Sequence, residues 1–541
     1  MRTLFHGGDI ITMEDADDAP ECLVIQDEDI VWVGDLPHGR ALLEDHDEQI
    51  DLAGACLLPG FIDAHGHMEM FGRFAQMVDL SGCESFEDIV ETLTAALEEH
   101  EGDGVLTGVR YDHNFLAEGR HPDRTVLDRV STTVPVFILH QSVHLGVAGS
   151  ALLARAGIDG STPDPAGGRF GREQDGRTPD GYIEELPALA ALGILPTAGD
   201  GAEASAAVTR ENLLSAQRAY FARGITTCQE GAASLETVEA LQEVGRAGEL
   251  LIDVVAYPLA NQAGLETLVE RSQQDEAYRD HVRIGGIKLI LDGSPQGRSA
   301  WLSAPYERAA SIEGDAGYRG YATLPDDTVR TVVGRGFEEG LQVLAHCNGD
   351  AAAEQFLVAC EAAGPAARAG APAPVMIHAQ TVRDDQLERM VPLGMVPSFF
   401  VGHVHWWGDV HVANLGEDRG RRISPVRSAL ERGLAFTLHQ DAPVTDPDMV
   451  HTLWTAVNRV TRAGRELGPE QAVSAWDALR GVTVLAAQQY GEQHRKGTLA
   501  AGRAADLVVL DRSPLSVEAA RLRELSVLAT YKDGRLVHQS G

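Results

Sequence analysis

Between residues 206 and 489 the sequence alternates helix-like segments with short apolar runs rich in β-branched residues. Strands that alternate with helices pair in parallel, because each helix carries the chain back to the start of the next strand. With a first run after Pro59 there are about eight strand candidates, the number in a (β/α)8 TIM-type barrel. The later candidates cover residues 225–229, 251–256, 286–290, 342–346, 374–378, 395–399 and 434–438. Pro397 weakens the prediction for residues 395–399, since proline cannot donate to a strand ladder.

The two ends of the chain have a different pattern. Residues 1–57 and 490–541 carry short β-rich runs separated by turns. Two terminal sets of strands can pair with each other and bring the chain ends together. We therefore expect a small composite β-sandwich beside a barrel made of residues 58–74 and 206–489.

Residues 75–205 interrupt the barrel after its first strand. The connection is far longer than those that usually join a strand to the next. It contains a helical segment at residues 86–99, a strand-like run at residues 134–139 and Gly/Pro-rich loops. We interpret it as an inserted subdomain that acts partly as a lid.

The chain has 44 basic and 81 acidic residues, a net charge of −37. This charge disfavours nucleic acid and anionic membranes as partners, because both attract a basic face. No apolar run approaches the ~20 residues of a membrane helix, and the N-terminus lacks the pattern of a signal peptide. The six cysteines are scattered among apolar neighbours, as is usual for free thiols in a reducing compartment. We expect a cytoplasmic protein acting on a small molecule, and a homodimer is compatible with the sequence.

Two histidines, His65 and His67, follow the first apolar run. Side chains alternate across a strand, so residues i and i+2 of a strand at residues 61–65 would point the same way. Two converging imidazoles suit a divalent transition metal such as zinc. A His-x-His pair alone is also common on surfaces and in cores, so further ligands are needed.

Polar residues lie at the carboxyl ends of the later strand candidates. His346, His378 and Asp441 each follow one, and Lys288 lies near the end of another. In parallel α/β barrels this face carries the active site. The sequence therefore predicts that these residues meet the first histidine pair at a metal site.

Lys288 is one of only three lysines, with Lys496 and Lys532. Its neighbours are apolar, and burying an unpaired ammonium is costly. One interpretation is a salt bridge to Asp292 or Asp441. The other is a carbamate, formed with carbon dioxide, which turns the cation into an anion able to bridge two metals.

At this point the sequence resembles the amidohydrolase superfamily. The resemblance rests on residues 59–67, on His346, His378 and Asp441, and on the C-terminal stretch 497–510. Residues 287–294, 345–350 and 378–380 are also similar to the amidohydrolase-3, or N-substituted formamide deformylase-like, branch. The sequence departs from that branch at residues 295–298, at Ile377 and at Gln440. Because the metal ligands are intact, these departures affect the expected substrate more than the chemistry.

The resemblance implies that His65 and His67 hold one metal with Asp441. His346 and His378 would hold a second, with Lys288 bridging as N6-carboxylysine. The cofactor would be two Zn²⁺ ions, although imidazole and carboxylate ligands also accept manganese or iron.

The expected reaction is hydrolysis of a non-peptide C–N bond in an amide or N-substituted formamide. Metal-activated hydroxide would attack, and Asp441 would act as general acid and base. The alternative enzyme is a mononuclear-metal aminohydrolase that deaminates a heterocyclic or amidine substrate; no His-x-x-Glu follows His346 to support it. A non-catalytic scaffold would have lost ligands, and all six are present.

Substrate-contact candidates come from the insertion and from loops after the strands. Aromatic faces could line an apolar substrate, and Arg298 could bind a carboxylate, although a packed loop and a structural salt bridge explain the same residues. Glu230, at the expected end of the second strand, is a candidate supporting group. The substrate candidates are Tyr111, His144, Asp292, Arg298, His405 and Trp407.

Overall fold

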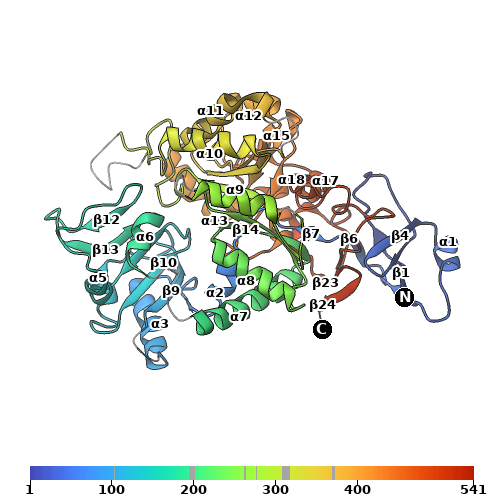
Figure 1. Cartoon of the computed structure of the whole chain (residues 1–541), viewed down its shortest axis with the longest axis horizontal. Coiled ribbons are helices and arrows are strands. Elements are labelled where there is room, and N and C mark those ends of the chain that lie inside the picture. Colours follow the sequence, from blue (N-terminus) through green and yellow to red (C-terminus); the bar gives the residue numbers. More distant parts are fainter. Residues whose placement is uncertain are drawn as a thin grey trace.

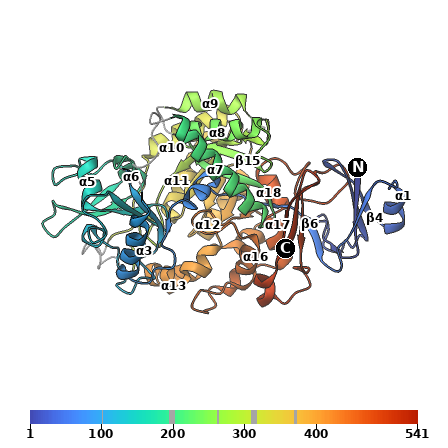
Figure 2. The same ribbon diagram turned by 90° about the horizontal axis from the view of Figure 1, so that it is seen from below.

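The computed structural model describes residues 1–540 except 101, 103, 194–201, 261–263, 276, 308–316 and 368–371. Its three parts lie in a row along the long axis (Figures 1 and 2). An α/β body occupies the middle, the insertion lies on one side of it, and sheets from both chain termini lie on the other.

The central body contains two parallel sheets. The first has the strand order β16-β15-β14-β7 and the second the order β17-β18-β19-β20-β21. Their bounds are β7 (Phe61–Ile62), β14 (Ile225–Ala233), β15 (Asp253–Pro258), β16 (Val282–Ile284), β17 (Gly286–Ile290), β18 (Gln342–Cys347), β19 (Val375–His378), β20 (Val396–Phe399) and β21 (Thr437–Leu438). All residues of β18 are buried, as expected for a parallel strand covered on both faces.

The sequence predicted one (β/α)8 barrel, and the described strands form two separate parallel sheets. They are linked at Leu259, which forms a parallel bridge with Lys288, and at Gly285, whose N–H donates to Ala256. The predicted strand at residues 395–399 does form, as β20, with Pro397 opposite Met376.

The first and second strands differ from the prediction. β7 ends at Ile62, so the His65/His67 pair lies in the following turn and not on a strand. The alternation argument for that pair was therefore wrong. β14 continues to Ala233, so Glu230 lies within this strand rather than at its end.

Helices cover the outer faces of the two sheets. Helix α8 shows why: Val238, Leu241 and Val244 recur every three residues, form one buried stripe, and leave the other faces polar. The principal helices are α2 (Met68–Phe74), α7 (Ala202–Phe221), α8 (Leu235–Arg246), α9 (Leu265–Gln274), α10 (Asp326–Glu338), α11 (Asp350–Ala367), α12 (Asp384–Leu393), α13 (Gly402–Leu415), α16 (Met449–Asn458), α17 (Ala475–Gly481) and α18 (Val484–Gln489).

Strands from both chain ends pair with each other. One sheet has the order β2-β6-β22-β23-β24, and β6 runs antiparallel to β22; a second sheet has the order β4-β3-β1-β5. Phe5, Leu23, Leu507 and Tyr531 belong to one apolar cluster that spans the two sheets. The bounds are β1 (Arg2–His6), β2 (Asp9–Ile10), β3 (Cys22–Gln26), β4 (Asp29–Gly34), β5 (Glu48–Asp51), β6 (Cys56–Pro59), β22 (Leu507–Leu510), β23 (Val527–Lys532) and β24 (Arg535–Gln539).

The insertion has its own sheet and core. The sheet order is β12-β13-β11-β10-β9-β8, and helix α3 (Phe86–Glu98), predicted from the sequence, packs Ile89 and Leu93 beneath it. The strands are β8 (Val78–Asp79), β9 (Leu106–Tyr111), β10 (Val136–His140), β11 (Leu145–Ala148), β12 (Arg169–Arg172) and β13 (Pro179–Glu184). The predicted boundary after residue 205 falls inside α7, and residues 194–201 before it lie outside the described residues.

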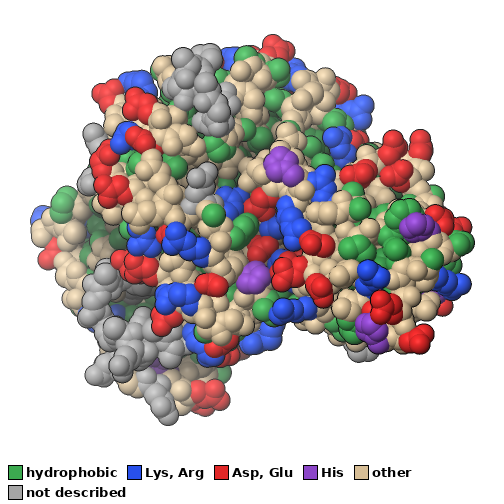
Figure 3. All heavy atoms as spheres, turned by 45° about the vertical axis from the view of Figure 1, so that its right-hand side comes forward, with side chains coloured by type: hydrophobic (Ala, Val, Ile, Leu, Met, Phe, Trp, Pro, Cys, Tyr) green, Lys and Arg blue, Asp and Glu red, His purple; other side chains and the backbone are tan. Residues whose placement is uncertain are grey.

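Charges of both signs meet where the terminal sheets join the central body. At the centre of Figure 3 basic and acidic side chains lie side by side. A cleft at this junction is lined by Asp253, Lys496 and Lys532, among other residues. In the part of the chain that the structure describes, no helix is both long and apolar enough to cross a membrane.

A glycine sets the position of the helix that follows His67. A Cβ atom at Gly72 of α2 would lie 2.0 Å from the Asn212 carbonyl oxygen of α7. We expect Gly72→Ala to push the two helices apart and lower the free energy of unfolding by about 1–3 kcal/mol. The measurement is the thermal unfolding midpoint.

The matched control is Gly334→Ala in α10, where an added Cβ meets nothing within 4 Å. It should raise the midpoint slightly, because it only reduces the freedom of the unfolded chain. Equal midpoints for the two variants would contradict the close approach of α2 and α7.

Candidate metal centre

The turn that carries His65 and His67 is anchored by backbone hydrogen bonds. Asp63 N–H donates to Thr227 O over 2.9 Å, and His67 N–H donates to Ala442 O over 2.7 Å. The turn thus contacts β14 on one side and the segment after β21 on the other.

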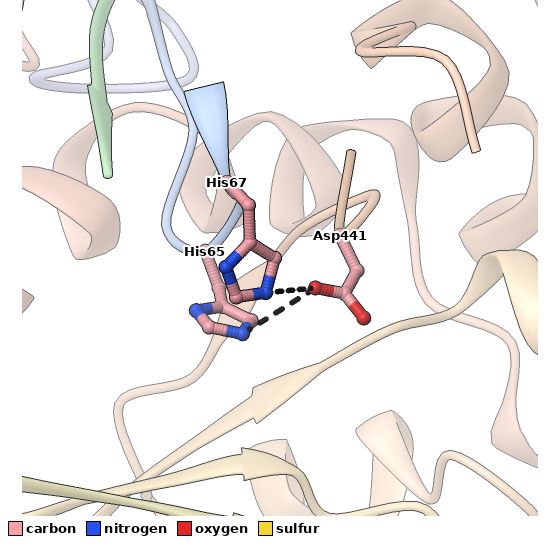
Figure 4. A group of neighbouring side chains, drawn as sticks. All are labelled: His65, His67 and Asp441. Atoms are coloured by element: carbon pink, nitrogen blue, oxygen red, sulfur yellow. Dashed lines mark ion pairs between the residues drawn. The ribbon is translucent and has the colours of Figure 1, made fainter. Parts of the chain in front are cut away.

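The two imidazoles converge on Asp441 (Figure 4). Asp441 Oδ1 lies 3.4 Å from His65 Nε2 and 3.3 Å from His67 Nε2. These separations match the edges of a tetrahedral site, in which bonds of ~2.0–2.1 Å place ligands ~3.3 Å apart. Asp441 Oδ1 is buried and accepts no hydrogen bond from the described residues. An orphaned carboxylate oxygen facing two imidazole nitrogens fits a divalent cation.

His346 and His378 lie beside this group. Their ring centroids are 4.5 Å apart, and His378 Nε2 is 3.9 Å from Asp441 Oδ2. The ring of His378 also lies 5.6 Å from that of His65. The fold therefore brings together the four histidines and the aspartate that the sequence singled out.

Hydrogen bonds orient the first two rings from behind. His65 Nδ1–H donates to Gln229 Oε1 over 2.5 Å, and His67 Nδ1–H donates to Gly231 O over 2.6 Å. In a neutral ring Nε2 then carries the lone pair, and each Nε2 faces Asp441. Support of this kind sets the tautomer and the ring direction of metal-binding histidines.

The other two rings are supported in the same way. Asp292 Oδ1 accepts from His346 Nδ1–H over 3.0 Å. His378 Nδ1 lies 3.2 Å from His439 Nε2, and His439 Nδ1 lies 2.9 Å from the Ser398 hydroxyl. A chain of hydrogen bonds thus connects β20 through His439 to His378.

Burial and charge decide the protonation of the group. Burial, followed by the charge of Lys288, holds the pKa of His65 well below its usual value. Burial also opposes ionisation of Asp441, but the neighbouring His67 and His65 side chains outweigh it and hold the pKa of Asp441 far below its usual range. An anionic carboxylate and a neutral imidazole are the states that bind metals.

Lys288 differs from the other two lysines. Lys496 and Lys532 are buried but paired, with Asp253 Oδ2 2.7 Å and 3.1 Å from their respective Nζ atoms. Lys288 is 1% exposed, makes no ion pair within the described residues, and places Nζ 3.4 Å from His65 Nε2. Burial lowers the pKa of Lys288 to about 7. The expected salt bridge to Asp292 or Asp441 is therefore not observed.

Two residues of the group have left-handed backbone. φ is 70° at His378 and 58° at Asp441. Non-glycine residues adopt this region at a cost, and such conformations cluster at functional sites. His378 is the last residue of β19, and Asp441 stands three residues after the end of β21, so both lie at the carboxyl ends of their strands.

The structure also locates the six substrate-contact candidates. His144 lies next to the centre, with its ring centroid 5.1 Å from that of His346. Asp292 is fully buried behind His346, and its carboxylate accepts hydrogen bonds from the backbone N–H groups of Asn348, Gly349 and Trp301. Arg298 is half-buried in the loop after β17.

The contacts of the other three candidates involve residues outside the group of four histidines and Asp441. Tyr111 is buried in the insertion and its hydroxyl lies 3.0 Å from His121 Nδ1. Trp407 is 2% exposed and donates from Nε1 to Asp112 Oδ2 over 2.6 Å. His405 Nδ1 lies 2.9 Å from Val460 O, and the His405 ring packs against the Trp454 ring.

A second group of potential ligands lies in the insertion and comprises Asp112, His113 and His140. Hydrogen bonds within the chain explain why these three side chains lie together. Ser142 N–H donates to His140 Nδ1, which leaves the proton of a neutral ring on Nε2, and Asn114 donates twice to Asp112 Oδ1. These bonds occupy the atoms that an ion would need.

Sequence reasoning missed His439 and Glu185. His439 stands two residues before Asp441, and this His-x-Asp spacing at the last strand was a usable signal. Glu185 accepts from His144 Nδ1–H over 2.7 Å, but it lies far along the chain from every predicted ligand, so no local pattern pointed to it.

Comparison with known proteins shows the family of this chain. A sequence model described as "Amidohydrolase family" matches residues 48–538. The chain belongs to the amidohydrolase family. It is a hydrolase of the metal-dependent amidohydrolase type, as the resemblance implied.

Individual relatives cover almost the whole chain. An N-substituted formamide deformylase of Arthrobacter pascens is 28% identical and aligns with 98% of this chain and 96% of its own. A structure described as an uncharacterized metal-dependent hydrolase from Pyrococcus horikoshii OT3 is 25% identical and covers 96% of this chain and 99% of its own, with a TM-score of 0.75. A similar hydrolase from Pyrococcus furiosus is 27% identical, covers 95% and 100%, and has a TM-score of 0.73.

The support behind His346 leads to a testable expectation. Asp292→Asn should weaken metal binding by about 10–100-fold, because the ring loses its charged partner while the shape of the site is kept. The measurement is a zinc titration against a chromophoric chelator. Asp327→Asn, at a side chain 93% exposed on α10, is the control and should bind as the parent does. Unchanged zinc affinity in Asp292→Asn would remove this residue from the site.

Proposed function

We propose that this amidohydrolase cleaves a non-peptide C–N bond of an amide or N-substituted formamide, releasing a carboxylic acid and an amine. The observation that carries the proposal is the meeting of Asp441 Oδ1 with His65 Nε2 and His67 Nε2 at 3.4 and 3.3 Å. The name of the 28% identical deformylase, which covers nearly the full chain, supports the choice of substrate class.

His65, His67 and Asp441 would hold one divalent ion, and His346 and His378 a second. Such ions, when bound, make water acidic and polarise a carbonyl oxygen. Zinc suits the imidazole-rich donor set. His65 and His67 fix the position of Asp441, which borders both histidine pairs.

Asp441 would move the proton. Its ionised carboxylate accepts a proton from the attacking water as the C–O bond forms. The same proton then passes to the leaving nitrogen as the C–N bond breaks, so that the amine departs neutral. The left-handed backbone at Asp441 supports this assignment, because it holds the carboxylate in one direction.

Lys288 would bridge the two ions as a carbamate. The reaction requires a neutral amine, which attacks carbon dioxide and loses a proton. Burial without an ion pair favours the neutral amine, and a bridging anion would offset the charge of two cations.

We further propose that the two parallel sheets are halves of one (β/α)8 barrel, in which β16 and β17, separated only by Gly285, act as one strand, and that the terminal sheets form a sandwich. The barrel is supported at both seams. Ala260 N–H donates to Lys288 O near the first, and Asp441 N–H donates to His65 O over 3.3 Å near the second. The apolar cluster shared by Phe5, Leu507 and Tyr531 supports the sandwich.

The proposed reaction is tested with a substrate panel. Zinc-loaded protein should release amine from N-substituted formamides or simple amides, measured with an amine-reactive dye, and should contain two zinc ions per chain by mass spectrometry. Ammonia release from cytosine-like heterocycles with one zinc per chain would instead support a mononuclear aminohydrolase. No turnover of either class would refute the proposed function.

Replacing the proton carrier separates binding from chemistry. Asp441→Asn should keep metal in the histidine pairs but lower kcat by about 10²–10⁴-fold, because an amide cannot accept the proton. Zinc content and kcat are measured on the same sample. Asp446→Asn, at a side chain 57% exposed that pairs with Arg110, is the nearby control and should retain activity. Full activity in Asp441→Asn would exclude Asp441 as the base.

A further inference from the structure

Helix α18 packs against both parallel sheets of the body. Ala486 and Ala487 of this helix, together with Tyr490 just after it, belong to one apolar cluster with residues of each sheet. Ile62 of β7 represents the first sheet in this cluster, and Leu344 of β18 represents the second. The end of α18 therefore lies inside the body and not on its surface.

Two side chains at the end of α18 hold the turn that leads to His65. The Tyr490 hydroxyl donates to Asp63 O over 2.8 Å, and Gln489 Nε2 donates to Ala64 O over 2.9 Å. Gln489 and Tyr490 are 2% and 6% exposed. Because the two carbonyls belong to the residues directly before His65, these bonds fix the backbone from which the His65 ring projects.

The Tyr490 hydroxyl also orients the side chain behind the His65 ring. Gln229 Nε2 donates to Ala64 O over 2.9 Å and to the Tyr490 hydroxyl over 3.2 Å. An amide group has two N–H donors, and both are used in these bonds. Gln229 Oε1 is thereby turned toward the ring and lies 2.5 Å from His65 Nδ1. Tyr490 therefore supports His65 in two ways, through the backbone of the turn and through Gln229.

The end of α18 is itself fixed from both sheets. Arg283 of β16 donates from Nη2 to Tyr490 O over 2.7 Å and from Nε to Glu492 Oε1 over 2.9 Å. The Thr437 hydroxyl of β21 donates to Gln489 Oε1 over 2.7 Å. Supporting groups whose own positions are locked can hold a binding site in one geometry.

We propose that Tyr490 and Gln489 are positioning residues that set the affinity of the ion site built on the His65 turn. Residues outside the ligand set orient the ligands, and their loss weakens metal binding. The inference rests on the metal centre of the proposed function, but it does not depend on which bond the enzyme cleaves. The second ion, held by ligands on other strands, would be unaffected.

The test is the zinc affinity of Tyr490→Phe, a change that removes only the hydroxyl. Affinity for one of the two zinc ions should fall by about 10-fold, because the turn and the Gln229 amide lose a fixed direction. Affinity is measured by competition with a chromophoric chelator. The thermal unfolding midpoint of the metal-free protein is measured on the same samples.

The matched control is Tyr257→Phe. Tyr257 is 0% exposed, belongs to the same apolar cluster, and has its ring centroid 6.4 Å from that of Tyr490. Its hydroxyl donates to Gln342 Oε1. Both tyrosine variants should lower the unfolding midpoint, because each loses a buried hydrogen bond. Tyr257→Phe should nevertheless bind both zinc ions as the parent protein does.

A second variant keeps the test decisive if Tyr490→Phe does not fold. Gln489→Met keeps the length of the side chain but cannot donate to Ala64 O, so it should weaken the same ion by a similar factor. Parental zinc affinity in either variant, or an equal loss in Tyr257→Phe, would overturn the inference and leave the proposed hydrolysis untouched. A parent protein that binds no zinc would refute the proposed metal centre and this inference with it.

Discussion

The contact of Asp441 with two imidazoles organises the centre of this protein. Asp441 follows β21, and His65 and His67 follow β7, so the contact joins the last strand of one sheet to the first strand of the other. An anionic carboxylate is costly to bury, and here the imidazoles hold it ionised. The hydrogen bonds with Gln229, Gly231 and His439 orient the rings of His65, His67 and His378 toward one place.

Buried charge also explains how the scarce lysines are used. Lys496 and Lys532 meet Asp253 where the terminal sheets join the body, so their charges are neutralised. Lys288 lies in the body without an ion pair among the described residues, beside His65. A buried amine without a counter-charge destabilises the fold, because its desolvation costs free energy that no ion pair offsets. The role proposed for Lys288 at the metal centre would explain why a lysine occupies this position.

The insertion contributes to the site through few residues. Most of it packs around its own core, with Ile89 and Leu93 of α3 beneath its sheet. At its edge Trp407 of the body donates to Asp112, and His144 reaches the ring of His346. The proposed ligands thus all come from the body, whereas the insertion adds His144 at the edge of the proposed metal centre. This division allows substrate preference to change without altering the ligands.

The sequence by itself determined that Lys288, His346, His378 and Asp441 lie in strands or directly after them, because a short apolar run and the polar residue that ends it are local signals. It could not determine that β7 stops at Ile62, that His439 supports His378, or that Asp292 stands behind His346. It also could not pair His144 with Glu185. Those facts were decided by the tertiary structure, because strand register and side-chain direction arise only when segments distant in the chain pack against one another.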